Sequence, residues 1–176
     1  VIVRGDGNLW YSGGMNAGIN KAFQLAVDYI LFLNNDNIVR PDFLNHLVET
    51  ALTSPNTKCC SLVYYESNRK SVRFGGGKFN KLTGLPRAYS SSESNILTQQ
   101  NQTYATEYAG GMGVLVHSSH MKDIGLLDQA SFPMCGDHEL WLRAQRIKKY
   151  KLRIEPKALV YGSTGQGNIR NNPSIR

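Results

Sequence analysis

The chain has 176 residues, of which 41% are hydrophobic and 19% charged, and this composition excludes a disordered chain. Its 20 Lys and Arg residues exceed its 13 Asp and Glu residues, and the net charge of +7 favours anionic ligands or acidic lipid surfaces as partners. Nucleic acid is not expected, because basic and aromatic residues are not interleaved and no binding motif is present. No apolar run approaches the roughly 18 residues of a membrane span. The length predicts one domain over residues 1–176.

The first half of the chain alternates short apolar runs with segments of helical periodicity. Residues 1–3 are all apolar, which predicts that the sequence begins inside a strand and that the natural N-terminus lies further upstream. Apolar residues then recur at helical spacing over 19–26 and 43–51. Between these segments, the run 29–33 predicts a buried strand that stops at a polar loop. This order of elements predicts an α/β fold with a mainly parallel sheet flanked by helices.

The second half of the chain also alternates patterned and polar segments. Polar residues dominate 88–103, which predicts a mobile loop, and the Gly- and Asn-rich end 162–176 predicts a flexible tail. Because patterned segments resume directly after the polar stretch, we do not interpret it as a linker between domains. The remaining pattern predicts a helix over 137–149 and strands over 58–65, 114–117, 151–155 and 158–161.

Asp36 is the first candidate for chemistry, because it follows the predicted strand 29–33 within a run of asparagines. In α/β sheets, ligands gather at the carboxyl ends of the strands. A carboxylate at that position is well placed to hold a divalent metal on a phosphate, since Mg²⁺ typically takes one or two protein carboxylates together with phosphate oxygens. The alternative is that the Asp36 side chain stabilises a turn.

A second candidate is the glycine-rich stretch 5–18, which leads into the first predicted helix. Glycines let a backbone approach a ligand closely, and a helix N-terminus favours anions. Asp6 would accept a hydrogen bond from a ribose or sugar hydroxyl. The stretch fits neither of the common phosphate-binding glycine patterns, so the alternative is a tight loop before a helix.

Asp137 is the third candidate, at the start of the predicted helix 137–149. A carboxylate held at a helix start and facing a cleft can act as a general base, and His138 beside it would tune it. The alternative is a simple N-cap. Glu139 would not share a helix face with Asp137, so we do not predict the paired carboxylates of a hydrolase.

The cysteines and the basic residues bear on the cellular location of the protein and on the surfaces that it contacts. The cysteines, Cys59, Cys60 and Cys135, follow no zinc or disulfide spacing, which predicts reduced thiols in a cytoplasmic protein. The segment 143–157 would either be a solvated helix face or contact an anionic acceptor or the inner face of the membrane. Its basic residues are Arg143, Arg146, Lys148, Lys149, Lys151, Arg153 and Lys157.

Taken in order, these segments resemble family 2 glycosyltransferases, which have the GT-A fold. GDGNLWYSGGMNAGI at 5–19 resembles the loop after the family's second strand, in a branch with a GDGNLWW-type sequence. DYILFLNNDN at 28–37 resembles the strand that carries an LNND variant of the family's metal motif. The glycines within 75–84, the strand segment 110–116 and the pattern over 124–143 follow in the family's order.

The resemblance implies single displacement with inversion, in which a sugar moves from a nucleotide-diphosphate donor to a hydroxyl of a glycan or lipid-linked acceptor. It implies a role in bacterial surface polysaccharide synthesis, with UDP- or dTDP-sugars as the expected donors. Asp36, helped by Asn34, would bind Mg²⁺ or Mn²⁺ on the diphosphate, and Asp137 would deprotonate the acceptor. The residues that would line the donor or acceptor are Asp6, Gly13, Gly14, Asn16, Asn34, Asn35, Gly111 and Met112.

The sequence departs from the family at three places. The opening strand that helps to hold the nucleotide base is missing, and Gly136 and Gly162 stand where the family has an acid and a metal-proximal His. Two alternatives therefore stay open: a degenerate, non-catalytic sugar- or nucleotide-binding module, and a nucleotidyltransferase that would release pyrophosphate. The intact Asp36 and Asp137 favour an active transferase.

Overall fold

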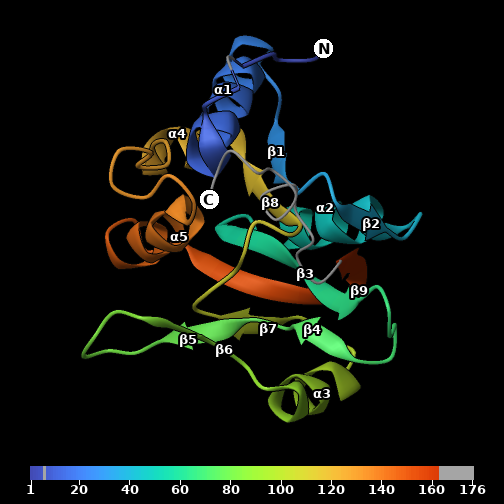
Figure 1. The fold of residues 1–176 in the computed structure, drawn as a ribbon. Helices are drawn as coiled ribbons and strands as arrows, with labels where there is room; N and C mark the ends of the chain where they lie inside the picture. The colour runs from blue at the N-terminus through green and yellow to red at the C-terminus, as the bar shows by residue number, and fades with distance from the viewer. Residues whose placement is uncertain (6, 163–176) are drawn as a thin grey trace, which may run out of the picture.

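A computed structural model describes residues 1–5 and 7–162, which form helices packed on a central sheet (Figure 1). None of the helices among these residues is long and apolar enough to cross a bilayer. In chain order the elements are α1 (Trp10–Gln24), β1 (Tyr29–Phe32), β2 (Asn37–Val39), α2 (Phe43–Thr53), β3 (Thr57–Tyr65), β4 (Val72–Phe74), β5 (Gly77–Phe79), β6 (Pro86–Ala88), α3 (Ser91–Gln99), β7 (Tyr104–Thr106), β8 (Val114–His117), α4 (Ser118–Ile124), α5 (Gly136–Arg146) and β9 (Lys151–Gly162).

The central sheet has the strand order β1-β8-β3-β9-β2, with β4 paired to β3 and β7 to β9, while β5 and β6 form a separate hairpin. The predicted mixed α/β fold is confirmed, but the expectation of a mainly parallel sheet is wrong. Only β3 and β9 pair in parallel, and the other pairs are antiparallel. The reason is that β8, from late in the chain, lies between β1 and β3 and runs opposite to both. β1, β3 and β9 therefore still point the same way, and their carboxyl ends share one edge.

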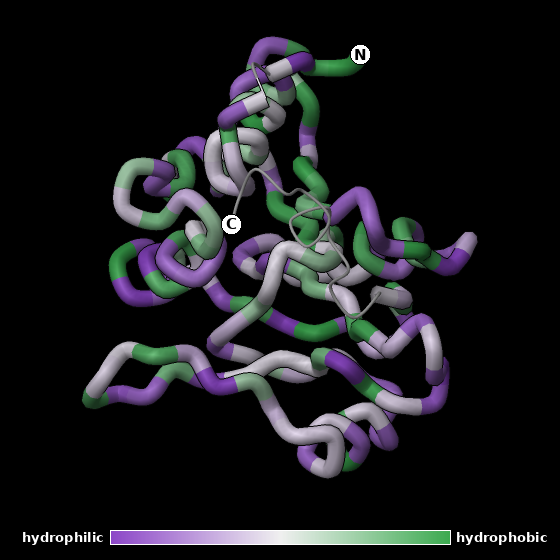
Figure 2. The backbone as a smooth tube through the Cα atoms, in the orientation of Figure 1, coloured by the Kyte–Doolittle hydropathy of each residue, from purple (hydrophilic) through white to green (hydrophobic). Residues whose placement is uncertain are grey.

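Both faces of the sheet are covered, as the alternation of β3 requires. Cys60 packs in a core with residues of α1, α4 and α5, whereas Cys59 packs in a second core with residues of α2. Hydrophobic residues accordingly concentrate in the strands that lie between these helices (Figure 2). Trp141 of α5 meets Phe32 of β1 edge to face, with ring centroids 5.4 Å apart. This contact helps to fix α5, which carries Asp137, over the end of β1.

The polar stretch 88–103 contains a helix, α3, where the composition predicted a mobile loop. Ser90 and Glu93 form a capping box: the Glu93 N–H donates to Ser90 Oγ at 3.2 Å, and the Ser90 N–H donates to the Glu93 carboxylate at 2.8 Å. Arg87 adds two hydrogen bonds to that carboxylate, at 3.0 and 3.1 Å. These local bonds satisfy the first N–H groups of the helix, so it forms with little apolar surface.

Three further boundaries differ from the sequence prediction. α1 begins at Trp10, well before 19–26, so Gly13 and Gly14 lie in a helix and not in a loop. The two predicted closing strands are one strand, β9, because a bulge after Glu155 accommodates Pro156, which has no N–H to donate. Residues 1–3 form no strand in the described structure. The predicted tail 162–176 lies outside the described residues except for Gly162, which ends β9.

Candidate active site

The loop that precedes β8 lies at the carboxyl-end edge of the sheet, beside the end of β1. The Gly113 N–H donates to the Phe32 carbonyl at 2.8 Å, and the Gly113 carbonyl accepts from the Ser61 N–H at 2.8 Å. The Ser61 hydroxyl also donates to the Met112 carbonyl. Gly113 has φ +92°, and a Cβ there would meet the Ser61 side chain, so only glycine suits this position. These bonds place Gly111 and Met112 at the edge where the turn with Asp36 begins.

Asp137 lies at the same edge, in the first turn of α5, and is only 7% exposed. The Gly111 N–H donates to its Oδ2 at 3.0 Å and the His138 N–H to its Oδ1 at 3.1 Å. Burial raises the pKa of Asp137 above its ordinary value, while His138 and the two N–H donors partly offset that rise. The structure therefore holds a carboxylate of increased proton affinity in a fixed orientation, as a general base requires.

Two tyrosines and a histidine surround Asp137. His138 Nε2 lies 2.8 Å from the Tyr108 hydroxyl and 3.9 Å from Asp137 Oδ1. Burial and the charge of Asp137 raise the pKa of Tyr108 to about 12, so its hydroxyl stays protonated at neutral pH. The Tyr11 hydroxyl is buried, has no hydrogen-bond partner among the described residues, and occupies the space that a Cβ on Gly111 would need. The sequence analysis missed both tyrosines. Tyr11 belongs to the glycine-rich stretch, but no pattern marked Tyr108.

The turn after β1 carries the predicted metal ligand. The Asn34 carbonyl accepts from the Asn37 N–H at 3.3 Å, and Asn35 and Asp36 are exposed in the turn between them. Among the residues that the structure describes, no group of three or more His, Cys, Asp or Glu side chains could hold a metal. The oxygen donors of Asp36 and Asn34 nevertheless suit Mg²⁺ or Mn²⁺, provided that the phosphates of a ligand complete the shell, which is the usual arrangement for Mg²⁺.

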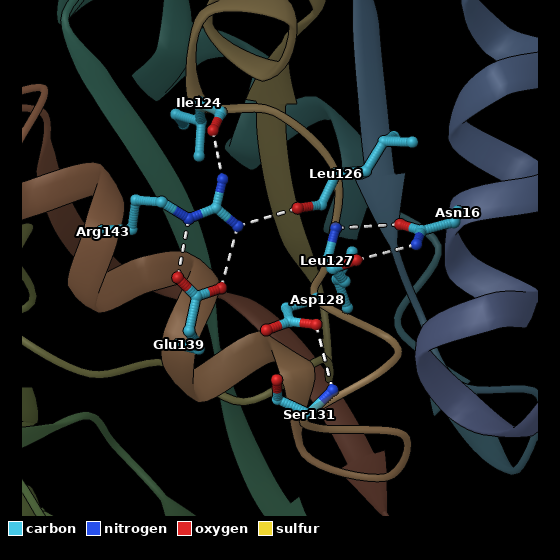
Figure 3. A network of polar contacts seen from close by, with 8 residues as sticks. All are labelled: Asn16, Ile124, Leu126, Leu127, Asp128, Ser131, Glu139 and Arg143. Carbon is cyan, nitrogen blue, oxygen red and sulfur yellow. Dashed lines mark hydrogen bonds and ion pairs between the residues drawn. The ribbon is translucent and has the colours of Figure 1, made fainter.

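The predicted donor-binding residues of the glycine-rich stretch take different positions. Asp6 lies outside the described residues. Gly13 is buried against Leu9 and Gly14 is exposed, both in the first turns of α1. The Asn16 amide donates to the Leu127 carbonyl and accepts from the Leu127 N–H, each at 2.9 Å. Asn16 thereby ties α1 to the loop that leads into α5 (Figure 3).

Arg143 fixes the other side of that loop (Figure 3). It makes two hydrogen bonds to Glu139, at 2.7 and 2.8 Å, and donates to the carbonyls of Ile124 and Leu126. Arg143 is therefore not part of a free basic face. Lys148 is likewise paired, at 2.9 Å from Asp123. The predicted membrane contact of 143–157 stays a prediction, and Arg146 and Lys149 are among its exposed members.

The two glycines that depart from the family pattern differ in how closely they are packed. A Cβ on Gly136 would overlap the Ser12 hydroxyl, so the first turn of α1 occupies the space of a side chain at this position. A Cβ on Gly162 would meet the Arg73 guanidinium, which is the end of a flexible side chain, so packing does not require glycine at this position.

Comparison with known proteins identifies the family and the fold of the chain. The model of the family "Glycosyl transferase family 2" matches residues 1–117. The chain belongs to this family. It is also similar to the solved structure of GalNAc-T7 with UDP, GalNAc and Mn²⁺, at a TM-score of 0.68 and 13% identity over 92% of this chain. This likeness confirms the GT-A fold. The present chain corresponds to 32% of the length of the GalNAc-T7 chain. No curated protein sequence matches it significantly.

Proposed function

We propose that this family 2 chain is an inverting glycosyltransferase that moves a sugar from a nucleoside diphosphate donor to a hydroxyl of a glycan or lipid-linked acceptor. The observation that carries the proposal is Asp137, a buried carboxylate with a raised pKa, oriented by two N–H groups. It lies at the sheet edge where the Asp36 turn also lies. The fold neighbour was crystallised with UDP and Mn²⁺, which supports a UDP-type donor.

In the proposed reaction, Asp137 takes the proton of the acceptor hydroxyl while the hydroxyl oxygen forms a bond to the anomeric carbon. The bond from that carbon to the diphosphate oxygen breaks, and its electron pair leaves with the nucleoside diphosphate. Attack from the face opposite the leaving group inverts the anomeric centre, through an oxocarbenium-like transition state. The raised pKa makes Asp137 a better proton acceptor than an exposed aspartate.

The neighbours of Asp137 would position the reactants. The N–H groups of Gly111 and His138 hold the carboxylate, and Tyr108 holds the His138 ring. The Tyr11 hydroxyl is buried beside Gly111 and has no hydrogen-bond partner among the described residues, so it helps to shape the surroundings of the carboxylate. Such groups keep the acceptor oxygen within reach of the base, which is a large part of the catalysis of a bimolecular reaction.

Asp36, with Asn34, would hold Mg²⁺ or Mn²⁺ against the diphosphate. When bound, the metal supplies positive charge that stabilises the leaving diphosphate. The resemblance to family 2 glycosyltransferases assigns the remaining donor and acceptor contacts, and we propose these contacts for this chain. We also propose that the chain acts in the cytoplasm in the synthesis of a bacterial surface polysaccharide. The residues concerned are Asp6, Gly13, Gly14, Asn16, Asn35, Gly111 and Met112.

A thermal-shift experiment tests the donor site. The melting temperature of the chain and of Asp36→Ala is measured with UDP, dTDP, GDP and ADP, each with and without Mn²⁺. A nucleotide at about 100 times its Kd should add roughly 2.7 kcal/mol to the free energy of unfolding. Asp28→Ala is the matched control, because it removes an exposed carboxylate at the opposite end of β1.

We expect a metal-dependent shift with UDP or dTDP that Asp36→Ala loses and Asp28→Ala retains. The proposal is wrong if no nucleotide shifts the melting temperature, or if Asp36→Ala responds like the parent chain. Nucleotide-sugar binding without turnover would instead identify a degenerate binding module. Release of pyrophosphate from a nucleoside triphosphate would identify a nucleotidyltransferase.

A further inference from the structure

The carboxyl end of β9 lies beside the turn that carries Asp36. Gly162, the last residue of β9, pairs with Asn37 of β2 on one side and with Tyr65 of β3 on the other. Asn37 directly follows Asp36 in the chain. Figure 1 shows β2 and the ends of β3 and β9 on the same side of the molecule. A group that lies against Gly162 is therefore close to the candidate metal ligand.

The guanidinium of Arg73 lies against Gly162. Arg73 belongs to β4, which pairs with the last part of β3. A Cβ on Gly162 would meet Arg73 Nη1, and it would also lie 3.5 Å from Asn37 Oδ1. The Arg73 cation and the Asn37 amide thus border the same point in space. Because residue 162 has no side chain, the guanidinium can reach this point at the edge of the sheet.

The polar groups at this point lack protein partners. Arg73 is half-buried, and no acidic side chain among the described residues forms an ion pair with it. Asn37 Nδ2 is buried and has no hydrogen-bond partner within the same part of the chain. Arg40, by contrast, pairs with Asp42 at 2.7 Å. A half-buried guanidinium beside an unsatisfied amide donor is suited to bind an anion.

The anion that the proposed function brings to this edge is the diphosphate of the donor. When the bond from the diphosphate to the sugar breaks, the bridging oxygen becomes a terminal phosphate oxygen, and the diphosphate gains negative charge. A cation beside it therefore stabilises the leaving group more strongly than the intact donor, and such differential binding accelerates a reaction. A guanidinium is well suited to this task, because its planar fork can donate two hydrogen bonds to one phosphate.

We propose that Arg73 binds the diphosphate of the donor in the space beside Gly162 and stabilises the nucleoside diphosphate as it leaves. This inference rests on the proposed transferase function, to which it adds a source of positive charge that needs no metal. Asp36 would account for the metal-dependent part of nucleotide affinity, and Arg73 for a part that persists without metal. A larger side chain at position 162 would push the guanidinium away from the Asp36 turn.

Binding of UDP and dTDP, measured by calorimetry in EDTA and in Mn²⁺, tests this role. Arg73→Gln removes the charge, Arg73→Lys keeps the charge without the fork, and Gly162→Val keeps Arg73 but fills the space beside it. Valine is compatible with the strand backbone at the end of β9. The matched control is Lys70→Gln, an exposed charge in the turn before β4. UDP-glucose and dTDP-glucose serve as probes of an intact donor diphosphate.

We expect Arg73→Gln to weaken the binding of the nucleoside diphosphate about tenfold in EDTA. The loss should be smaller for the nucleotide sugar, whose diphosphate carries less charge. Arg73→Lys should recover part of the affinity, and Gly162→Val should behave like Arg73→Gln. Lys70→Gln should bind like the parent chain, and Asp36→Ala should lose only the part of the affinity that depends on Mn²⁺.

Two results would overturn the role of Arg73. One is equal affinity of Arg73→Gln and the parent chain in both solutions. The other is an equal loss in Lys70→Gln, which would show that net charge and not position matters. If the parent chain binds neither nucleotide in either solution, the proposed donor site itself fails. Nucleotide binding by the parent chain in Mn²⁺ that Arg73→Gln leaves unchanged would instead refute only this inference.

Discussion

Asp137→Asn should gain stability relative to the parent chain as the pH rises, while it removes transfer activity. Burial raises the folded-state pKa of Asp137, so the folded chain holds this proton more tightly than the unfolded chain. The stability from the bound proton is complete below the unfolded pKa and is lost as the pH rises through the folded pKa. Above the folded-state pKa the parent chain therefore contains a buried charge that asparagine, of nearly the same shape, does not have.

The size of the effect follows from the same linkage. Each unit by which the folded-state pKa exceeds the unfolded value corresponds to about 1.4 kcal/mol of unfolding free energy. For a chain of this length, each kcal/mol changes the melting temperature by about 2–4 °C. Asparagine can still accept a hydrogen bond from one N–H donor, and the loss of the other would cost about 1 kcal/mol at every pH. The pH dependence of the difference between variant and parent is therefore the informative quantity. The loss of a general base should lower kcat by about 10²–10⁴.

The assay is urea unfolding followed by tryptophan fluorescence, between pH 4 and pH 8, since the buried Trp141 reports on the packing of α5. Asp128→Asn is the matched control, because the N–H groups of Ser131 and Ala130 lower the pKa of Asp128. Its variant should lose stability relative to the parent as the pH rises to about 5, which is the opposite sign, and the difference should stay constant above that pH because both states of the chain are then ionised at Asp128. If the Asp137→Asn difference is flat with pH, or if the variant transfers sugar at the parent rate, the assignment of a buried base fails.

Three further predictions concern the surroundings of the site and the core. Gly111→Ala should destabilise the chain, because its Cβ would overlap the Tyr11 hydroxyl, and Tyr11→Phe should restore part of the loss. A double-mutant cycle of unfolding free energies would measure this as a coupling of about 1 kcal/mol. Arg143→Met should cost about 2 kcal/mol, because the charge-assisted bonds to Glu139 and to two carbonyls are lost, and calorimetry would contradict this if the melting temperature did not fall. Lys58 is 0% exposed without a hydrogen-bond partner among the described residues, and burial lowers its pKa to about 7. Lys58→Met should therefore increase the free energy of unfolding at and below about pH 7. This gain should disappear towards about pH 10, because only the folded lysine is neutral between these two pH values. A gain that is constant with pH would refute the reasoning.

The sequence was sufficient for elements whose pattern is local. The periodicity of 43–51 predicted α2, the apolar runs predicted β1, β3 and β8, and the order of five segments predicted the family. Composition failed at 88–103 because the capping box of Ser90 and Glu93 acts through specific hydrogen bonds and not through average polarity. Periodicity failed at the start of α1 because its first turns have few apolar residues and are held by packing. Ser12, for example, bonds to the backbone before α5.

The order of residues in the chain establishes which residue type stands at each candidate position: a carboxylate after a buried strand and another at a helix start. The surroundings of these carboxylates depend on the packing of distant segments. β8 enters between β1 and β3 and brings the Gly111 N–H to Asp137, although these two residues are 26 positions apart. Tyr108 reaches His138, and the hairpin β5–β6 closes an apolar cavity beside them. Local patterns could not predict these surroundings, because the pKa of a carboxylate and the shape of a cavity depend on groups from distant segments, and the packing of the whole sheet brings those groups together.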